Sequence, residues 1–349
     1  RPLFMQALHY AHEDLEFARH RRGQQRFYNK LRPARVVYLN LDIGQHGLGG
    51  HSCGPEPEEG CSLRPGVFKW KLRIRGVGMN SAQIGSIPVW YRSSTDMALQ
   101  PMWVYCPSNR TDRPYPLLVG FHSWSMNWQS PERQMLERFC EERGWLLAYP
   151  NFRGPNESPD ACGSMMAGAD VLDAIDTMKR CYKVDESRIY AIGGSGGGHF
   201  SLLMAGRYPE LWAGVCAMCP ISDLALWYKQ CDELGDWRNR YARMLERSCG
   251  GRPENRNAEY ALRSPISCLK AARDVPIAIH EGIHDGHIGS VPVGHAIRAF
   301  NELALDADQI DEDAISYIEN AESIPKHLRI SEVADPFFDE RPKVHFRRI

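Results

Sequence analysis

The stretch Arg188-Ile189-Tyr190-Ala191-Ile192-Gly193-Gly194-Ser195-Gly196-Gly197-Gly198-His199 decides the fold of this chain. Its apolar first half predicts a buried strand, and residues 199–206 predict a helix. A strand, a glycine-rich turn with one serine at its tip and a helix form the arrangement that exposes a serine hydroxyl as a nucleophile. Gly193 and Gly197, two residues either side of Ser195, prevent collisions in so sharp a turn. The alternatives are a plain glycine-rich turn or a phosphate-binding loop, but the latter requires a Lys-Ser/Thr pair that does not follow here.

The composition is that of a globular protein without the excess of charge that would attract nucleic acid or an anionic membrane. Of 349 residues 43% are hydrophobic, and 42 basic against 43 acidic residues give a formal net charge of −1. The chain can therefore form one large or two ordinary domains. We expect no nucleic-acid partner and no membrane partner, because the charge is balanced and no apolar run reaches the length of a membrane span. A small-molecule or oligosaccharide ester fits better as the substrate, and the oligomeric state stays open.

The eleven cysteines are odd in number and scattered, several of them in apolar runs. We expect mostly reduced, buried thiols and a cytoplasmic location. The first residues lack a signal-peptide core, although the chain begins at Arg1 rather than Met and a preceding segment could carry one. Cys216 and Cys219 have the spacing of a redox or zinc pair, but no second pair is nearby. The sequence therefore predicts no metal and no cofactor.

Two parts of the chain differ in pattern, residues 1–76 and residues 77–349. In the first, residues 36–41 predict a strand, and residues 68–74 alternate apolar and basic side chains as a half-buried antiparallel strand does. In the second, short apolar strands alternate with helical stretches, which predicts an α/β fold with a mostly parallel sheet flanked by helices. The strands are expected at 87–91, 102–105, 117–121, 145–149, 189–192, 214–218 and 276–280, the helices include 133–143 and 167–180, and 224–263 is a candidate cap.

The first part carries a recognisable set of residues: His9, Glu13-Asp14-Leu15, Ala18-Arg19-His20, Tyr38-Leu39-Asn40-Leu41-Asp42, Gln45, Gly47-x-Gly49-Gly50 and Cys53-Gly54-Pro55. In these it resembles the last β-sandwich domain of the large bacterial β-galactosidases, which implies an N-terminal all-β fragment. In several members of that family a tryptophan lines the sugar site where Cys53 stands here. The barrel domain with the two catalytic carboxylates of such an enzyme is absent from the chain, and glycoside hydrolysis needs both. We therefore expect a structural remnant, and the chain looks like the tail of something longer.

A serine nucleophile needs a base, an acid that orients the base, and an oxyanion hole. Asp285, in the loop after the strand at 276–280, is the candidate acid because it follows Ser195 in the chain order Ser, Asp, His of the α/β-hydrolases. Asp223 is the rival, and local turn hydrogen bonds suit it better.

The oxyanion hole is expected to use the backbone N–H of Gly196 and one from the loop after the third strand. In that loop Trp124 and Ser123 are the candidates, and the sequence leaves open which amide serves. His122 is expected to brace this loop, because a base at that position contradicts the expected chain order. His199 is expected to be packed or hydrogen-bonded within its helix.

Four motifs carry a second resemblance: Asn151-Phe152-Arg153-Gly154, Asp170-x-x-Asp173-Ala174-Ile175, Asp185-x-x-Arg188-Ile189 and Gly193-Gly194-Ser195-Gly196-Gly197-Gly198-His199. They look like the catalytic domain of the prolyl-oligopeptidase-type serine hydrolases, over about residues 85 to 349. That group includes peptidases and carbohydrate esterases of the acetylxylan-esterase kind. The resemblance implies an α/β-hydrolase fold and a serine nucleophile, and says little about the substrate.

The histidine base departs from the family pattern. It should lie in a loop after a last strand, commonly in a Gly-Gly-His-like turn, and none of the histidines after Asp285 lies in such a turn. We expect the chain to stop at Ile349, before that strand and its histidine, with His345 or His327 as the alternatives. A chain without its base is nearly inactive.

The sequence thus favours a serine hydrolase that cleaves carboxylic esters, with acyl groups on carbohydrates preferred because a fragment resembling a sugar enzyme precedes it. A serine peptidase of the prolyl oligopeptidase type is the alternative with the same chemistry. A catalytically silent carbohydrate-binding or structural terminus is the alternative of another class. A sugar-stacking rim is conceivable from five aromatic residues, with plain packing as the simpler interpretation: Trp124, Trp128, Trp227, Tyr228 and Trp237.

Overall fold

The computed structural model describes residues 85–109 and 111–329, and the backbone of four short strands outside these ranges. The chain divides into two compact units, Arg1–Gly76 and Val77–Ile349. In the first unit β1 (Phe4–Leu8) pairs antiparallel with β2 (Tyr38–Asp42). In the second, β10 (Glu332–Val333) pairs antiparallel with β11 (Val344–His345). The strand expected at residues 68–74 lies outside the described residues.

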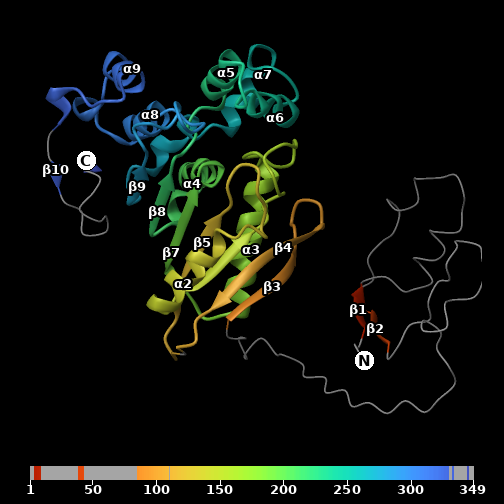
Figure 1. Cartoon of the computed structure of the whole chain (residues 1–349). Coiled ribbons are helices and arrows are strands. Elements are labelled where there is room, and N and C mark those ends of the chain that lie inside the picture. The colour runs from red at the N-terminus through yellow and green to blue at the C-terminus, as the bar shows by residue number, and fades with distance from the viewer. Residues whose placement is uncertain are drawn as a thin grey trace, which may run out of the picture. The chain divides into compact units, whose positions relative to one another are not determined.

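A seven-stranded sheet in the order β3-β4-β6-β5-β7-β8-β9 forms the centre of the second unit (Figure 1). Strands β5 to β9 run parallel, while β4 is antiparallel to both of its neighbours. The expected α/β fold with a mostly parallel sheet is confirmed. The strands are β3 (Gly85–Arg92), β4 (Leu99–Cys106), β5 (Tyr115–Phe121), β6 (Leu146–Pro150), β7 (Val184–Gly194), β8 (Gly214–Met218) and β9 (Ile277–His280).

Helices follow most of the parallel strands, as the alternating pattern predicts. The α-helices are α2 (Arg133–Arg143), α3 (Met165–Cys181), α4 (Gly196–Arg207), α5 (Leu224–Leu234), α6 (Asn239–Cys249), α7 (Pro253–Arg263), α8 (Gly294–Leu303) and α9 (Glu312–Ala321). Single 3-10 turns are η3 (Pro209–Leu211), η4 (Pro265–Ser267), η5 (Leu269–Ala272), η6 (Asp306–Asp308) and η7 (Lys326–Leu328).

Helices cover both faces of the sheet because successive side chains of a strand point to opposite faces. On β5, Leu117 joins the buried cluster that contains Val171 of α3 and Phe200 of α4. Its neighbour Leu118 belongs to a separate cluster with Cys140 of α2. Helix α2 therefore packs on one face, and α3 and α4 pack on the other. The run of β5 is buried on both sides, as expected of a central parallel strand.

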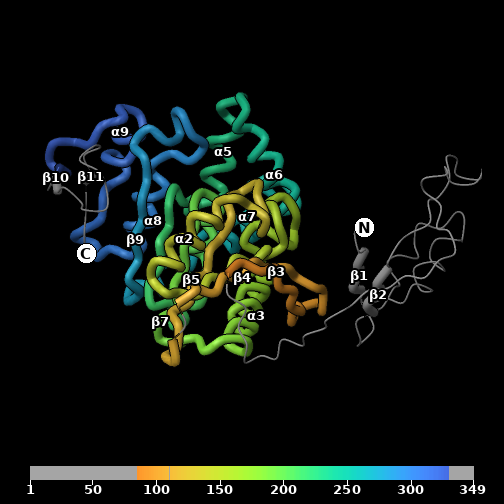
Figure 2. The backbone as a smooth tube through the Cα atoms, turned by 60° about the horizontal axis from the view of Figure 1, so that its bottom comes forward, coloured from red at the N-terminus to blue at the C-terminus, as the bar shows by residue number. Residues whose placement is uncertain are grey.

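Helices α5, α6 and α7 make up the segment considered as a cap, and they keep that name below. They are grouped at the end of the sheet where the chain leaves β8 (Figure 1) and pack against one another (Figure 2). Their shared core contains three of the five aromatic residues considered as a sugar-stacking rim. Trp124, Trp227 and Tyr228 are 2%, 1% and 3% exposed. These three are packed, and Trp237, 49% exposed, is the one that faces solvent most openly.

The cysteines described in residues 85–109 and 111–329 form no disulfide with one another, and several of them, such as Cys140 and Cys162, are buried as expected. In the same part of the chain no helix has both the length and the apolar character needed to cross a membrane.

Candidate active site

Three neighbouring strands end in register at one edge of the sheet. Gly194 of β7 pairs with Met218 of β8, and Met218 pairs with His280 of β9. The residues that follow are Ser195, Cys219 and Glu281, so the topology brings the candidate nucleophile and the start of the candidate acid loop to the same edge. Ligand and active sites of parallel α/β sheets lie at this carboxyl edge.

Ser195 occupies the sharp turn between β7 and α4. Its backbone has φ 55° and ψ −118°, a combination that side chains rarely adopt, and its N–H donates to the carbonyl of Met218 at 2.8 Å. The two flanking glycines are sterically required: a Cβ on Gly193 would lie 2.4 Å from the backbone of Gly197, and one on Gly197 would lie 2.3 Å from the carbonyl oxygen of Phe121. The turn thus holds the serine at the N-terminus of a helix, where free N–H groups favour negative charge.

The loop after β5 packs against this helix terminus. A Cβ on Gly196 would lie 2.6 Å from the backbone nitrogen of Trp124, so the two expected oxyanion amides are close neighbours. The other candidate is engaged elsewhere, since the Ser123 N–H donates to Oε2 of Glu132 at 3.3 Å and its hydroxyl donates to Oε1 at 2.5 Å. Among the described residues no acceptor takes the N–H of Trp124. Of the two amides left open by the sequence, that of Trp124 is the one without an acceptor among the described residues.

The loop after β6, which begins with the Asn151-Phe152-Arg153-Gly154 motif, forms the wall beside the oxyanion loop. Arg153 binds Asp170 of α3 through Nε at 2.5 Å and a second nitrogen at 3.1 Å, and both side chains are buried. This paired ion bridge anchors the loop on α3. Farther along, the N–H of Asn156 donates to the carbonyl of Trp124 at 2.9 Å and ties the two loops together.

Three fully buried histidines bond to groups other than Ser195 and Asp285. The ring nitrogens of His122 face the carbonyl oxygens of Ser123 and Asn151, each at 3.0 Å, and the ring stacks on Phe152. His199 Nε2 lies 2.8 Å from the carbonyl oxygen of Arg263, and burial lowers the pKa of His199 to about 4. His295 lies between Ser222 and Gln230, and burial lowers its pKa to about 3. These rings brace loops and stay neutral at pH 7.

Of the two histidines considered within the chain as a base, His327 lies exposed in η7. The side chain of His345 lies outside the described residues.

Asp285 lies in the loop after β9, where Oδ1 accepts the N–H groups of Gly286 at 2.8 Å and Val291 at 3.0 Å. Gly289 is required beside it, because a Cβ there would lie 2.0 Å from the same oxygen. The rival Asp223 has another function: its Oδ1 accepts the N–H groups of Ala225 and Leu226 and caps α5. This is the local role expected for it.

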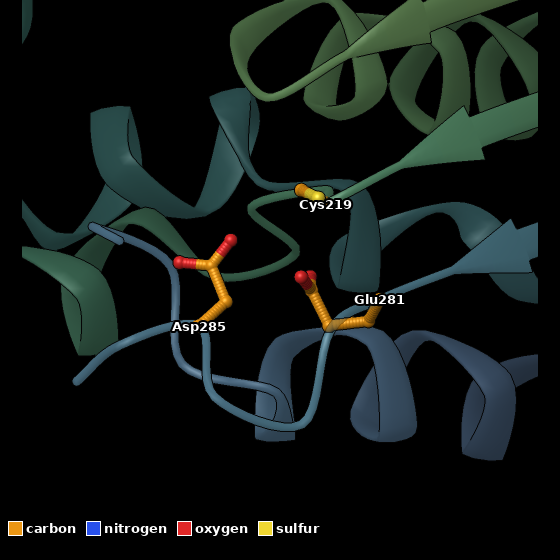
Figure 3. Close-up of side chains that lie close together, drawn as sticks. All are labelled: Cys219, Glu281 and Asp285. Atoms are coloured by element: carbon orange, nitrogen blue, oxygen red, sulfur yellow. The ribbon is translucent and has the colours of Figure 1, made fainter. Parts of the chain in front are cut away.

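Two side chains that sequence reasoning did not select lie against Asp285. Figure 3 shows Cys219 and Glu281 beside it, and the sulfur and carboxyl oxygens lie within 4.8 Å of one another. Burial, followed by the charge of Asp285, raises the pKa of Glu281 to about 9. Burial and the two carboxylates raise the pKa of the Cys219 thiol to about 12. At pH 7 Glu281 is therefore a neutral acid that can donate a hydrogen bond.

The same three side chains are the metal-ligand types that the structure brings together in the described part of the chain. A metal ion binds deprotonated ligands and has to displace protons from them. Here both Glu281 and Cys219 hold their protons strongly. A metal ion bound here would therefore have to displace the protons of Glu281 and Cys219.

The cap contacts the acid loop directly. The indole N–H of Trp227 donates to the carbonyl of Ser290 at 2.7 Å, and the guanidinium of Arg238 donates to the carbonyl oxygens of Gly286 and Gly289. Cap and acid loop therefore support each other.

A separate apolar hollow of about 680 Å³ lies on the α2 face of the sheet and is lined by residues such as Leu118, Phe139 and Trp145, away from the loops described above.

Two family profiles match the chain. The prolyl oligopeptidase family matches residues 132–320, which is more than half of the chain. The β-galactosidase small chain matches residues 3–74.

Characterised relatives match over shorter stretches. A feruloyl esterase B of Neurospora crassa is 26% identical over 156 residues, which are 40% of this chain and 51% of the esterase. A dipeptidyl-peptidase 5 of Porphyromonas gingivalis is 28% identical over 163 residues, which are 41% of this chain and 22% of the peptidase. The chain thus matches about half the length of the first and about a fifth of the second.

Solved structures share the fold. A Pyrococcus horikoshii acylaminoacyl peptidase superposes with a TM-score of 0.51 at 19% identity, over 63% of this chain and 35% of the peptidase. A puromycin hydrolase superposes with a TM-score of 0.52 at 18% identity, over 63% of this chain and 33% of the hydrolase.

Proposed function

The chain belongs to the prolyl oligopeptidase family of serine hydrolases, and we propose that it transfers acyl groups from carboxylic esters to water with Ser195 as the nucleophile. The observation that carries the proposal is the strained backbone of Ser195 at the N-terminus of α4. Beside it lie backbone N–H groups for which the described residues supply no acceptor. Strained backbone of this kind persists where function requires it.

In this mechanism the Ser195 hydroxyl attacks the ester carbonyl carbon and forms a tetrahedral oxyanion. The amides of Gly196 and Trp124 stabilise that charge, while Ser123 contributes by fixing the loop through Glu132. The alcohol leaves as the acyl-enzyme forms, and water then releases the acid by the same steps in reverse.

Asp285 orients the histidine that moves the protons, as the third member of the triad. Two backbone N–H groups hold one of its oxygens in place, and neutral Glu281 adds no second charge. The general base is a histidine that approaches between Ser195 and Asp285.

Ester substrates are favoured over peptides by context. The match to a feruloyl esterase covers 51% of that protein, against 22% of the dipeptidyl-peptidase. The β-galactosidase-like match at residues 3–74 supports an acyl group carried by a carbohydrate. A peptidase is the second candidate, supported by the 28% identity to a dipeptidyl-peptidase.

The experiment compares p-nitrophenyl acetate and an acetylated xylo-oligosaccharide with a proline-linked peptide amide. Ser195→Ala is the nucleophile variant, and Ser187→Ala, at an exposed position near the start of β7, is the matched control. Each assay is run with and without added imidazole, because free imidazole can itself act as a general base.

Ester cleavage that is lost in Ser195→Ala and retained in Ser187→Ala supports the proposal. Peptide cleavage without ester cleavage would favour the peptidase. If neither substrate is cleaved and a fluorophosphonate does not label Ser195, with imidazole present, the chain is catalytically silent and the proposal fails.

A further inference from the structure

One buried amide group beside the oxyanion loop has no partner. Asn156 is 1% exposed, and no described acceptor takes the protons of its side-chain nitrogen Nδ2. A buried donor without a partner loses about 1–3 kcal/mol, so most buried polar groups of native proteins have one. The missing partner is therefore informative.

The orientation of this amide is fixed by its other end. The N–H of Cys162 donates to Oδ1 of Asn156 at 2.9 Å, which identifies the oxygen and leaves Nδ2 on the opposite side. The backbone of Asn156 is fixed as well, since its N–H donates to Trp124 and its carbonyl accepts the hydroxyl of Ser248 at 3.3 Å. The Asn156 side chain is thus held in place before any ligand binds.

Nδ2 lies close to Gly196 and Trp124, whose amides are the expected oxyanion donors. The position that a Cβ on Gly196 would occupy lies 3.0 Å from Asn156 Nδ2 and 2.6 Å from the backbone nitrogen of Trp124. The same position lies 2.5 Å from the Cα atom of Trp124, so Asn156, Gly196 and Trp124 are tightly packed here. A side-chain N–H₂ and a backbone N–H, both without a described acceptor, thus lie together next to the residue that follows the nucleophile.

We propose that Asn156 is a catalytic residue whose side-chain amide donates to the oxyanion as a third donor, beside the amides of Gly196 and Trp124. This rests on the proposed function of Ser195. The incoming carbonyl oxygen acquires negative charge only as Ser195 attacks, so a donor fixed in advance stabilises the transition state more than the bound substrate. Asn156 therefore acts on kcat and leaves KM nearly unchanged.

The test measures kcat and KM for p-nitrophenyl acetate, with imidazole present, in Asn156→Ala and Asn156→Asp. The matched control is Asn301→Ala, because Asn301 is a partly buried asparagine of α8 whose side chain bonds to the backbone of Ile310. We expect Asn156→Ala to lower kcat about a hundredfold with KM within a fewfold, and Asn301→Ala to retain kcat.

Asn156→Asp keeps the acceptor for Cys162 and replaces the donor by an acid. When ionised, this acid repels the oxyanion, and when protonated it donates. The ratio of its kcat to that of the unsubstituted chain should therefore rise as the pH falls. A purely structural Asn156 predicts no such pH dependence.

Retention of kcat within twofold in Asn156→Ala would overturn the assignment, as would a loss of thermal stability with kcat unchanged. If Asn156→Ala does not fold, Asn156→Asp still tests the assignment. A ratio of its kcat to that of the unsubstituted chain that does not change with pH would overturn it. Absence of Ser195-dependent turnover in the unsubstituted chain would overturn the proposed function itself, and the assignment of Asn156 with it.

Discussion

Replacing Glu281 by glutamine should remove a pH dependence of stability that originates beside the candidate acid. The native pKa of Glu281 is raised to about 9, by burial first and then by the charge of Asp285, from an ordinary value of 4.5. Between these two values the folded chain holds a proton that the unfolded chain releases. The free energy of unfolding therefore falls as the pH rises through this window, by about 1.4 kcal/mol per pH unit.

Between pH 6 and pH 8.5 this proton accounts for a decrease of about 3 kcal/mol. Glutamine at position 281 is neutral at every pH and keeps a donor toward Asp285. The assay is urea unfolding of the unsubstituted chain and of Glu281→Gln at both pH values. We expect the stability of the unsubstituted chain, relative to the variant, to decrease by about 3 kcal/mol over this interval.

Glu210→Gln, which removes an exposed carboxyl, is the matched control for the change in charge. Comparing variants cancels the other titrating groups of the protein. Parallel changes in Glu281→Gln and the unsubstituted chain from pH 6 to pH 8.5 would refute a protonated Glu281.

Three further substitutions test the elbow and its support by measuring the free energy of unfolding. Ser195→Gly should abolish hydrolysis and raise stability by about 1 kcal/mol, because glycine adopts φ 55° without strain; equal or lower stability would contradict a strained elbow. Gly197→Ala should lower stability by about 3 kcal/mol, since its Cβ would meet Phe121 O at 2.3 Å, and an alanine that is tolerated would refute this packing. Asp170→Asn should cost about 1–3 kcal/mol, because the buried Arg153 loses one of its two carboxylate partners and keeps the other, Asp96; unchanged stability would show the bridge to be dispensable.

The sheet could be predicted because its determinants are local. The apolar runs that became β5 to β9 are short and bounded by turn residues, and Gly193 and Gly197 fit a turn whose geometry depends on sequence neighbours. The position of Asp285 followed from chain order alone.

The remaining parts of the site depend on contacts between segments far apart in sequence. In the sequence, nothing distinguishes Glu281 from an ordinary glutamate in a loop. Its pKa is raised because the side chain is buried once β9 pairs with β8, and because Asp285 lies close to it. Asn156 lies in a polar loop. Its unpartnered Nδ2 can be identified only in the folded chain, where the N–H of Cys162 donates to Oδ1 of the same amide. The register of β7, β8 and β9 was the available signal for Cys219 and Glu281, because residues following three paired strand ends share one edge.

The loops around Ser195 carry strain as well as unpaired donors. Non-glycine residues with positive φ include Phe152, Arg153 and Cys162 in the loop that supports Asn156, and Ser195 and Cys219 at the strand ends. Each such backbone lowers stability by about 1–3 kcal/mol and persists because surrounding contacts determine it. These contacts are the anchored Arg153, the paired loops and the cap. Their combined effect is to fix the oxyanion donors before substrate arrives, so little reorganisation is needed when charge develops on the carbonyl oxygen. The proposed acyl transfer requires donors that are held in place in this way, even though the strained backbone around them lowers the stability of the folded chain.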